Sequence, residues 1–301
     1  MSALAATLRE TSEAVHPPPR LEASLALDFA RDESSGRTVL AASAQQPPLR
    51  VVRAFDLADG SALAHLHNVS GGLLGGDRLA LRVRVGPGAS AQLTTTGATR
   101  IYRPRAESPA ATQTNEVGVA ENALVEYVPD AIIPFAGARF SQRTTIRLAP
   151  GAGLFWWEIA APGREAHGEV FQYECVEMMM DVFAAGRLIA AERITLEPEK
   201  YPLTSIARMG AYRYWATFYI CRVGLAAGVW MIAEQRLREV AGELARPGET
   251  LWATSALVAD GLVVRGLGRH GRDVQTGLHA MWRAAKRLLY GRETIPPRKV
   301  N

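Results

Sequence analysis

The sequence predicts a mainly β protein: an extended superhelical or flattened-sandwich β structure followed by two C-terminal α-helices. Three observations carry this prediction. Hydrophobic residues alternate with period two in the first two thirds, a turn-and-strand layout recurs, and helical spacing is confined to the last third. Of the 301 residues, 48% are hydrophobic and 21% charged, a globular composition that excludes a disordered or fibrous chain.

The chain is expected to begin with a flexible arm over residues 1–20, because Pro17-Pro18-Pro19 resist both helix and sheet. Residues 21–301 are interpreted as a single β-rich domain. Its clearest strand is Leu79 to Val85, in which Leu and Val alternate with Ala and Arg. Gly86-Pro87-Gly88 then predicts a turn into another strand.

One layout occurs three times, in segments 85–93, 119–127 and 148–156. Each segment passes from a strand end through a turn of small residues, with alanine at its fifth place, into a new strand. The short repeat favours stacked hairpins over a parallel sheet with crossover helices.

The last third changes in character. Apolar residues at helical spacing predict helices near 212–245 and 273–290. Between them, segments 252–259 and 262–265 are expected to pair as strands about Asp260-Gly261, a hairpin signal.

Composition also excludes several function classes. The net charge is +4, but the arginines are dispersed among acids, which argues against nucleic-acid binding. None of the three lysines follows a glycine, so there is no P-loop. Cys175 and Cys221 are too few for a disulfide scaffold or a four-thiolate zinc site. The first residues lack the pattern of a signal peptide and no segment has a membrane-spanning pattern, so we expect no signal peptide, no membrane association and a cytoplasmic location.

The segment Gly266 to Gly271 reads G-x-G-x-x-G between a predicted strand and a helix, the local context of a dinucleotide site. Only about thirty residues follow, too few for the rest of a Rossmann fold. The glycines are therefore expected to shape the loop.

Carboxylate residues next to aromatic residues in predicted strands suggest an alternative function, that of a hydrolase. Glu126, Asp130 and Glu158 lie close to Tyr127 and Trp156-Trp157 in the sequence. If Glu126 and Glu158 faced each other across a cleft, they could serve glycosidase-like chemistry. Each could equally be a surface residue or have an arginine partner.

The strongest local signal is GGLLGGD. Two glycine pairs around two leucines allow close backbone approach or positive φ angles; they are Gly71, Gly72, Gly75 and Gly76. Asp77 follows them. His65 and His67, two residues apart, share one side of a strand. Two imidazoles and a carboxylate are ligands that suit a borderline transition metal.

The segment NVSGGLLGGDRLALRVRVGPGASAQLTTTGATRIYRP (68–104) closely resembles the hallmark of the urease accessory protein D family (UreD, also called UreH). The resemblance continues in EYVPDAIIPFAGARF (126–140), in WWEI with GRxxxGE (156–169) and in GRxxxPPR (291–298). The region 195–260 matches less distinctly, and the tail lacks the aromatic residue that usually follows the last arginine.

The resemblance implies a non-enzymatic maturation factor. Family members help to deliver nickel and to assemble the carbamylated dinuclear centre of urease. They act with accessory proteins F and G, the latter a GTPase, on apo-urease. The family fold is a β-rich superhelix or flattened sandwich with two C-terminal helices. The resemblance also implies that the protein has no tightly bound cofactor and that it binds Ni²⁺ only transiently.

Six residues of the family motifs carry over: Asp77, Tyr102, Arg103, Asp130, Glu158 and Arg164. We expect a polar path that relays Ni²⁺ through weak, exchangeable oxygen and imidazole ligands, which release an ion that a thiolate cage would trap. Asp77, Asp130 and Glu158 suit this path, with His65 and His67 near an entrance. The glycine pairs, Tyr102, Arg103 and Arg164 are assigned structural or interface roles.

Three alternatives remain open. Asp77 is also suited to stabilising a turn, and Glu158 could pair with Arg164 as a buried ion pair between the β layers. The protein could also bind partners without ever binding metal. We expect an exposed hydrophobic patch, where a partner docks, on the C-terminal helices among Trp230, Leu237, Leu278 and Trp282. The alternative for each of these residues is burial in an ordinary core.

Overall fold

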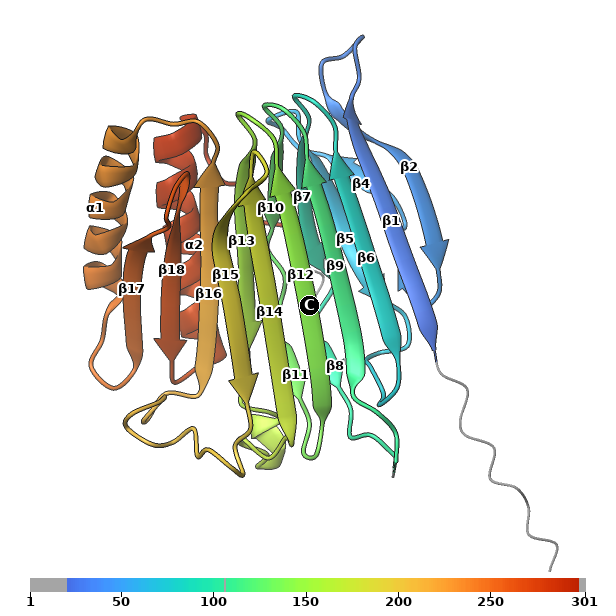
Figure 1. The fold of residues 1–301 in the computed structure, drawn as a ribbon, viewed down its shortest axis with the longest axis vertical. Coiled ribbons are helices and arrows are strands. Elements are labelled where there is room, and N and C mark those ends of the chain that lie inside the picture. The colour runs from blue at the N-terminus through green and yellow to red at the C-terminus, as the bar shows by residue number, and fades with distance from the viewer. Residues whose placement is uncertain (1–20, 106, 298–301) are drawn as a thin grey trace, which may run out of the picture.

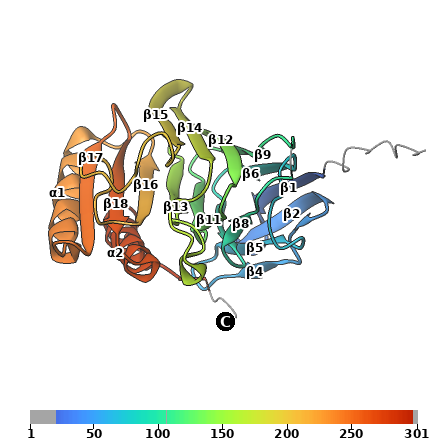
Figure 2. The same cartoon turned by 90° about the horizontal axis from the view of Figure 1, so that it is seen from below.

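A computed structural model describes residues 21–105 and 107–297, and the mainly β fold class is confirmed over these residues. They form two sheets packed face to face, with two helices against the outer face of the second sheet at one end (Figures 1 and 2). We call the sheet nearer the viewer in Figure 1 the front sheet and the other the back sheet. The predicted arm of residues 1–20 lies outside the described residues.

The front sheet has seven strands. In spatial order they are β15 (Arg187–Leu196), β14 (Cys175–Ala184), β12 (Arg139–Leu148), β9 (Ala111–Val119), β6 (Arg78–Val85), β1 (Glu22–Arg31) and β2 (Thr38–Gln46). The five inner strands run parallel, and β2 and β15 pair antiparallel at the two edges.

The back sheet has eleven strands among the described residues. Its main path is β17 (Thr250–Ala256), β18 (Gly261–Gly268), β16 (Tyr214–Arg222), β13 (Gly153–Ala160), β10 (Leu124–Tyr127), β7 (Ser90–Thr95), β5 (Ala62–Asn68) and β3 (Leu49–Arg50). The short strands β4 (Ala54–Asp56), β8 (Thr99–Ile101) and β11 (Ile132–Pro134) lie beside this path. Strands β5, β7, β10 and β13 are parallel, whereas β16, β18 and β17 are antiparallel.

The three repeats carry the chain from the front sheet to the back sheet, as β6 to β7, β9 to β10 and β12 to β13. The shared alanines, Ala89, Ala123 and Ala152, are buried where the chain crosses. The superhelical expectation is confirmed, but the stacked hairpins are wrong. Each turn leads the chain into the opposite sheet. Successive parallel strands of one sheet are therefore connected through a strand of the other sheet, which serves as the crossover that parallel pairing requires.

Apolar side chains from both sheets fill the space between them. In β6, the predicted alternation is confirmed: Leu79, Leu81, Val83 and Val85 are buried, and the residues between them are exposed. Trp156 of β13 enters the same layer from the back sheet.

Helices α1 (Ala227–Leu244) and α2 (Gly271–Tyr290) cover the outer face of the back sheet. The helix predicted near 273–290 is confirmed. The helix predicted over 212–245 is wrong in its first part, because Tyr214–Arg222 is strand β16, hydrogen-bonded between β13 and β18. Seven of its nine residues are buried, so the strand lacks the period-two pattern that would have marked it. The hairpin about Asp260-Gly261 is confirmed.

The four helix residues considered for a docking patch are all buried in the core beneath the helices: Trp230, Leu237, Leu278 and Trp282. The ordinary-core alternative therefore holds for them. On the same helix as Trp230, Met231 and Ile232 are exposed instead.

The G-x-G-x-x-G segment serves close packing. Gly266 and Gly268 belong to strand β18, and a Cβ atom on Gly266 would overlap the ring of Trp252. A Cβ atom on Gly277 of α2 would overlap the same ring. The missing side chains let α2 lie close against the sheet.

This packing makes a stability prediction. Gly277→Ala should lower the free energy of unfolding by about 1–3 kcal/mol, because the added methyl group forces Trp252 or α2 to move. Urea unfolding measures the change. The control is Gly242→Ala on the exposed face of α1, where a Cβ atom meets nothing within 4 Å. It should raise stability by up to about 1 kcal/mol through helix propensity. Equal effects of the two substitutions would contradict the packing argument.

Candidate functional site

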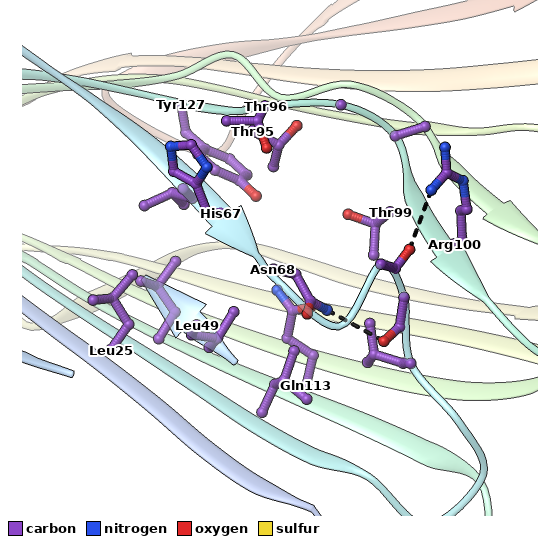
Figure 3. Close-up of a pocket in the computed structure, with 18 residues that line it drawn as sticks. Leu25, Leu49, His67, Asn68, Thr95, Thr96, Thr99, Arg100, Gln113 and Tyr127 are labelled. Atoms are coloured by element: carbon purple, nitrogen blue, oxygen red, sulfur yellow. Dashed lines mark hydrogen bonds between the residues drawn. The ribbon is translucent and has the colours of Figure 1, made fainter. Parts of the chain in front are cut away.

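A cavity of about 280 Å³ lies between the two sheets (Figure 3). We call it the inter-sheet cavity. Leucines from both sheets form its apolar wall. Its polar lining comes from the back sheet, the loops beside it and β9: His67, Asn68, Thr95, Thr96, Thr99, Arg100, Gln113 and Tyr127. Gly71, Gly72, Gly97 and Ala98 also line it.

A second cavity of about 20 Å³, enough for about one water molecule, adjoins the first. We call it the carboxylate cavity because Asp130 and Glu158 line it together. The two cavities share Thr99, Gln113 and Tyr127. A polar lining therefore continues from His67 to Glu158, and the structure brings together two of the three predicted carboxylates.

Glu158 faces the front sheet from β13 and is only 8% exposed. Its Oε1 accepts hydrogen bonds from Gln142 Nε2 at 2.6 Å and Trp156 Nε1 at 3.4 Å. Burial raises the pKa of Glu158 to about 7, against the smaller effect of these bonds. Its carboxyl group is therefore poised to gain or lose a proton near neutral pH.

The ion pair considered between Glu158 and Arg164 does not form. Arg164 instead donates from Nε to Glu169 Oε2 at 2.8 Å. Its guanidinium also lies over the ring of Phe135, with 4.2 Å from Cζ to the ring centroid. The ring of Tyr102 also packs edge-on against the ring of Phe135, with 5.0 Å between the two centroids.

Asp130 lies where the back sheet is interrupted between β10 and β11. Its backbone N–H donates to Thr95 Oγ1 at 2.9 Å, and its Oδ1 accepts from Gln275 Nε2 of α2 at 3.4 Å. Gln275 lines a third cavity, of about 320 Å³, with His279. Asp130 thus connects the space between the sheets to the side of the back sheet that α2 covers.

Asp77 does not line either of the first two cavities. It is 8% exposed, and its Oδ2 accepts the N–H of Leu74 at 2.8 Å. The backbone N–H of Asp77 donates to Leu74 O at 3.0 Å. These are the contacts of a carboxylate that closes a turn.

The glycine pairs surround this turn. Gly71 and Gly76 have positive φ angles of 82° and 91°. A Cβ atom on Gly72 would lie 2.6 Å from Arg100 O, and one on Gly75 would overlap Pro104. The loop can therefore press directly against β8 and the segment after it. Arg103, in that segment, packs its side chain against Gly137.

His65 and His67 both lie half-buried on β5, but they have different neighbours. His67 lines the inter-sheet cavity, whereas His65 packs against Phe55, with ring centroids 5.8 Å apart. Among the residues that the structure describes, no three His, Cys, Asp or Glu side chains are grouped to hold a metal ion.

Glu126 lies on the opposite face of the back sheet from Glu158. It is 1% exposed, and its carboxylate accepts from Lys286 Nζ at 2.6 Å and Trp282 Nε1 at 2.6 Å, both from α2. Asp59 Oδ2 is 3.6 Å from Lys286 Nζ. Because a β-sheet separates Glu126 from Glu158, the hydrolase alternative that pairs them is wrong.

Sequence reasoning missed Lys286. The signal was available: Lys286 follows Trp282 by four residues, one helical turn, and so lies on the same apolar face. A lysine there requires a buried carboxylate partner.

Comparisons of the sequence with known proteins identify the family of this chain. The sequence model of the family described as UreD urease accessory protein matches residues 21–301. The chain belongs to this family. It is 45% identical to the urease accessory protein UreD of Herpetosiphon aurantiacus, over 93% of this chain and 97% of the relative.

Two more distant relatives carry the same name. The UreD of Halalkalibacterium halodurans is 34% identical over 67% of this chain and 74% of its own length. The UreD of Pseudomonas fluorescens is 33% identical over 93% and 95%. Within the described part of this UreD-family chain, neither helix is long and apolar enough to cross a membrane.

The buried ion pair gives a second prediction. Lys286→Met should lower the free energy of unfolding by about 3–5 kcal/mol, because Glu126 then lacks its cation in the interior. The double variant Glu126→Gln/Lys286→Met should recover most of the loss, since the Gln amide oxygen still accepts from Trp282. Chemical unfolding of both variants checks this, and additive losses would contradict the pairing.

Glu158 gives a third prediction, on pH. Its folded-state pKa is raised, so the folded protein holds more protons than the unfolded chain between about pH 4.5 and 7. Stability is therefore greatest below this window and falls through it, by about 3 kcal/mol, as the pH rises. In Glu158→Gln this component should vanish. The measurement is the difference in unfolding free energy between wild type and variant at pH 5 and pH 8, and a constant difference would refute the shift.

Proposed function

We propose that this chain acts in urease maturation as a non-enzymatic scaffold that relays Ni²⁺ toward apo-urease. The observation that carries the proposal is the adjacency of the two cavities, which share Thr99, Gln113 and Tyr127, with Asp130 and Glu158 lining the smaller one. Membership of the UreD family supports the maturation role. Nickel is the cargo here, with no tightly bound cofactor.

In this proposal the ion enters at His67 and moves past Thr99, Gln113 and Tyr127 to the carboxylate cavity. Asp77 and His65 support the walls near the entrance. From Asp130 the route leads through the interruption of the back sheet to Gln275 and the cavity beside His279.

The chemistry of the inner site suits transfer. A divalent cation that binds Glu158 displaces its proton, so acid weakens binding and neutral pH favours it. Oxygen and imidazole ligands that do not form a closed set hold an ion weakly and release it to a better site.

The partners in this proposal are accessory proteins F and G and apo-urease, in the cytoplasm. The support is the family and the shared name of the relatives, urease accessory protein. The alternative in which the chain binds partners but never metal is an outcome of the following experiment.

The fourth prediction tests the path. A host supplies the urease structural genes and accessory proteins F and G, and this chain is wild type or Asp130→Asn/Glu158→Gln. The double variant should still assemble in pull-downs, because both substitutions keep side-chain shape. The purified urease should contain about tenfold less nickel, with activity reduced in parallel, because carboxylate ligands are lost.

The matched control is Glu116→Gln, which removes an exposed carboxylate of the front sheet that pairs with Arg82. It should leave nickel content unchanged. Normal nickel in urease matured by the double variant would favour the partner-only alternative. Loss of the complex would assign the two carboxylates to structure, and full urease activity without this chain would refute the maturation role.

A further inference from the structure

The lining of the inter-sheet cavity is unusual for a site that receives cations. None of the eighteen described residues that line it is an aspartate or a glutamate, while Arg100 and His67 are among them (Figure 3). The carboxylates of the proposed route belong to the adjoining smaller cavity. The two cavities therefore differ in the charge of their linings.

Arg100 lies exposed on β8 with its guanidinium without a carboxylate partner among the described residues. Within the described part of the chain, its Nη1 donates only to Gly71 O, at a long 3.4 Å (Figure 3). Many other arginines of the chain are paired: Arg82, Arg164 and Arg213, for example, each contact a glutamate. Arg100 thus keeps most of its hydrogen-bonding capacity for a ligand.

The bend that joins β7 to β8 adds further donors. The backbone N–H groups of Gly97 and Ala98 make no hydrogen bond to other described residues, nor do the hydroxyl groups of Thr96 and Thr99. All four residues line the cavity. Backbone amides in a bend, hydroxyl groups and a guanidinium are the groups with which proteins bind oxyanions.

We propose that the inter-sheet cavity binds a small oxyanion between Arg100 and the bend from Thr96 to Thr99. The ligand class comprises carboxylate, bicarbonate and phosphate ions, whose oxygen atoms accept several hydrogen bonds at once. The cavity volume of about 280 Å³ is many times the roughly 10–15 Å³ that a single water molecule needs, so such an ion fits together with bound water.

The site has one consequence for nickel transfer, which rests on the proposed function. A divalent cation in this cavity meets no carboxylate, and Arg100 repels it. A bound oxyanion supplies the missing negative charge, so the cation and anion can occupy the cavity together. The oxyanion site itself does not depend on nickel and is tested without it.

The fifth prediction is measured by isothermal titration calorimetry on the full chain in nickel-free buffer. Phosphate, bicarbonate and formate are titrated separately at constant ionic strength, with chloride as the reference ion. We expect saturable binding of at least one oxyanion at one site, and the three titrations identify which. Arg100→Gln should weaken this binding about tenfold or more, since it removes a charge-assisted hydrogen bond.

The matched control is Arg105→Gln, which makes the same charge change at an exposed residue that does not line the cavity. It should change the affinity less than twofold. A second cavity variant, Thr96→Val, keeps the side-chain shape and should weaken binding severalfold. It decides the question if Arg100→Gln fails to fold.

Two results would overturn the proposal: no oxyanion binds above the chloride reference, or Arg100→Gln and Arg105→Gln weaken binding equally, which indicates general attraction to a basic surface. Because nickel is absent, failure here leaves the nickel route standing. Conversely, normal oxyanion binding with a failed urease assay would leave this site standing.

Discussion

Strand β13 buries all eight of its residues, because the front sheet covers one of its faces and α2 covers the other. Alternate residues of the strand therefore enter different layers. Trp156 and Glu158 face the front sheet, whereas Phe155 and Trp157 pack against the helices. This double burial determines the environment of the charged groups in the interior.

The two buried glutamates show how strongly that environment acts. Glu126, on the helix side, is balanced by Lys286, which is itself 1% exposed, so the pair fastens α2 to the sheet. Glu158, on the other side, has amide and indole donors but no cationic partner among the described residues. A carboxyl group in that position holds its proton more tightly, because burial disfavours the charged form. A cation that reaches Glu158 would meet a carboxyl group that folding has already removed from water.

Access to Glu158 depends on a second feature, the interruption of the back sheet. Strand β7 gives way to β8 after Thr95, and β10 gives way to β11 after Tyr127, at neighbouring places. The backbone there leaves the strand ladder, so polar groups line a cavity in an otherwise apolar layer. The carboxylates of the carboxylate cavity and the donors around Arg100 thus line two adjacent cavities that share Thr99, Gln113 and Tyr127.

Local patterns predicted much of this. The alternation in Leu79–Val85, the hairpin about Asp260-Gly261 and the helix near 273–290 depend on neighbours in the sequence, and the structure has them. The motif around Asp130 and Glu158 singled out two carboxylates that do share a cavity. Strand β16 was predicted as helix, because burial on both faces removes the periodicity that distinguishes a strand from a helix.

The sequence by itself determined the β-rich class, the family and the identity of the chemistry-bearing residues. Only the tertiary structure decided which of them meet. The turn residues do not determine whether the next strand joins the same sheet or the other one. Yet that choice places Glu158 beside Asp130, sets Glu126 on the far face, and leaves Asp77 closing a turn. Side-chain partners across two sheets and a helix arise from packing of distant segments, and the free energy of burial selects them.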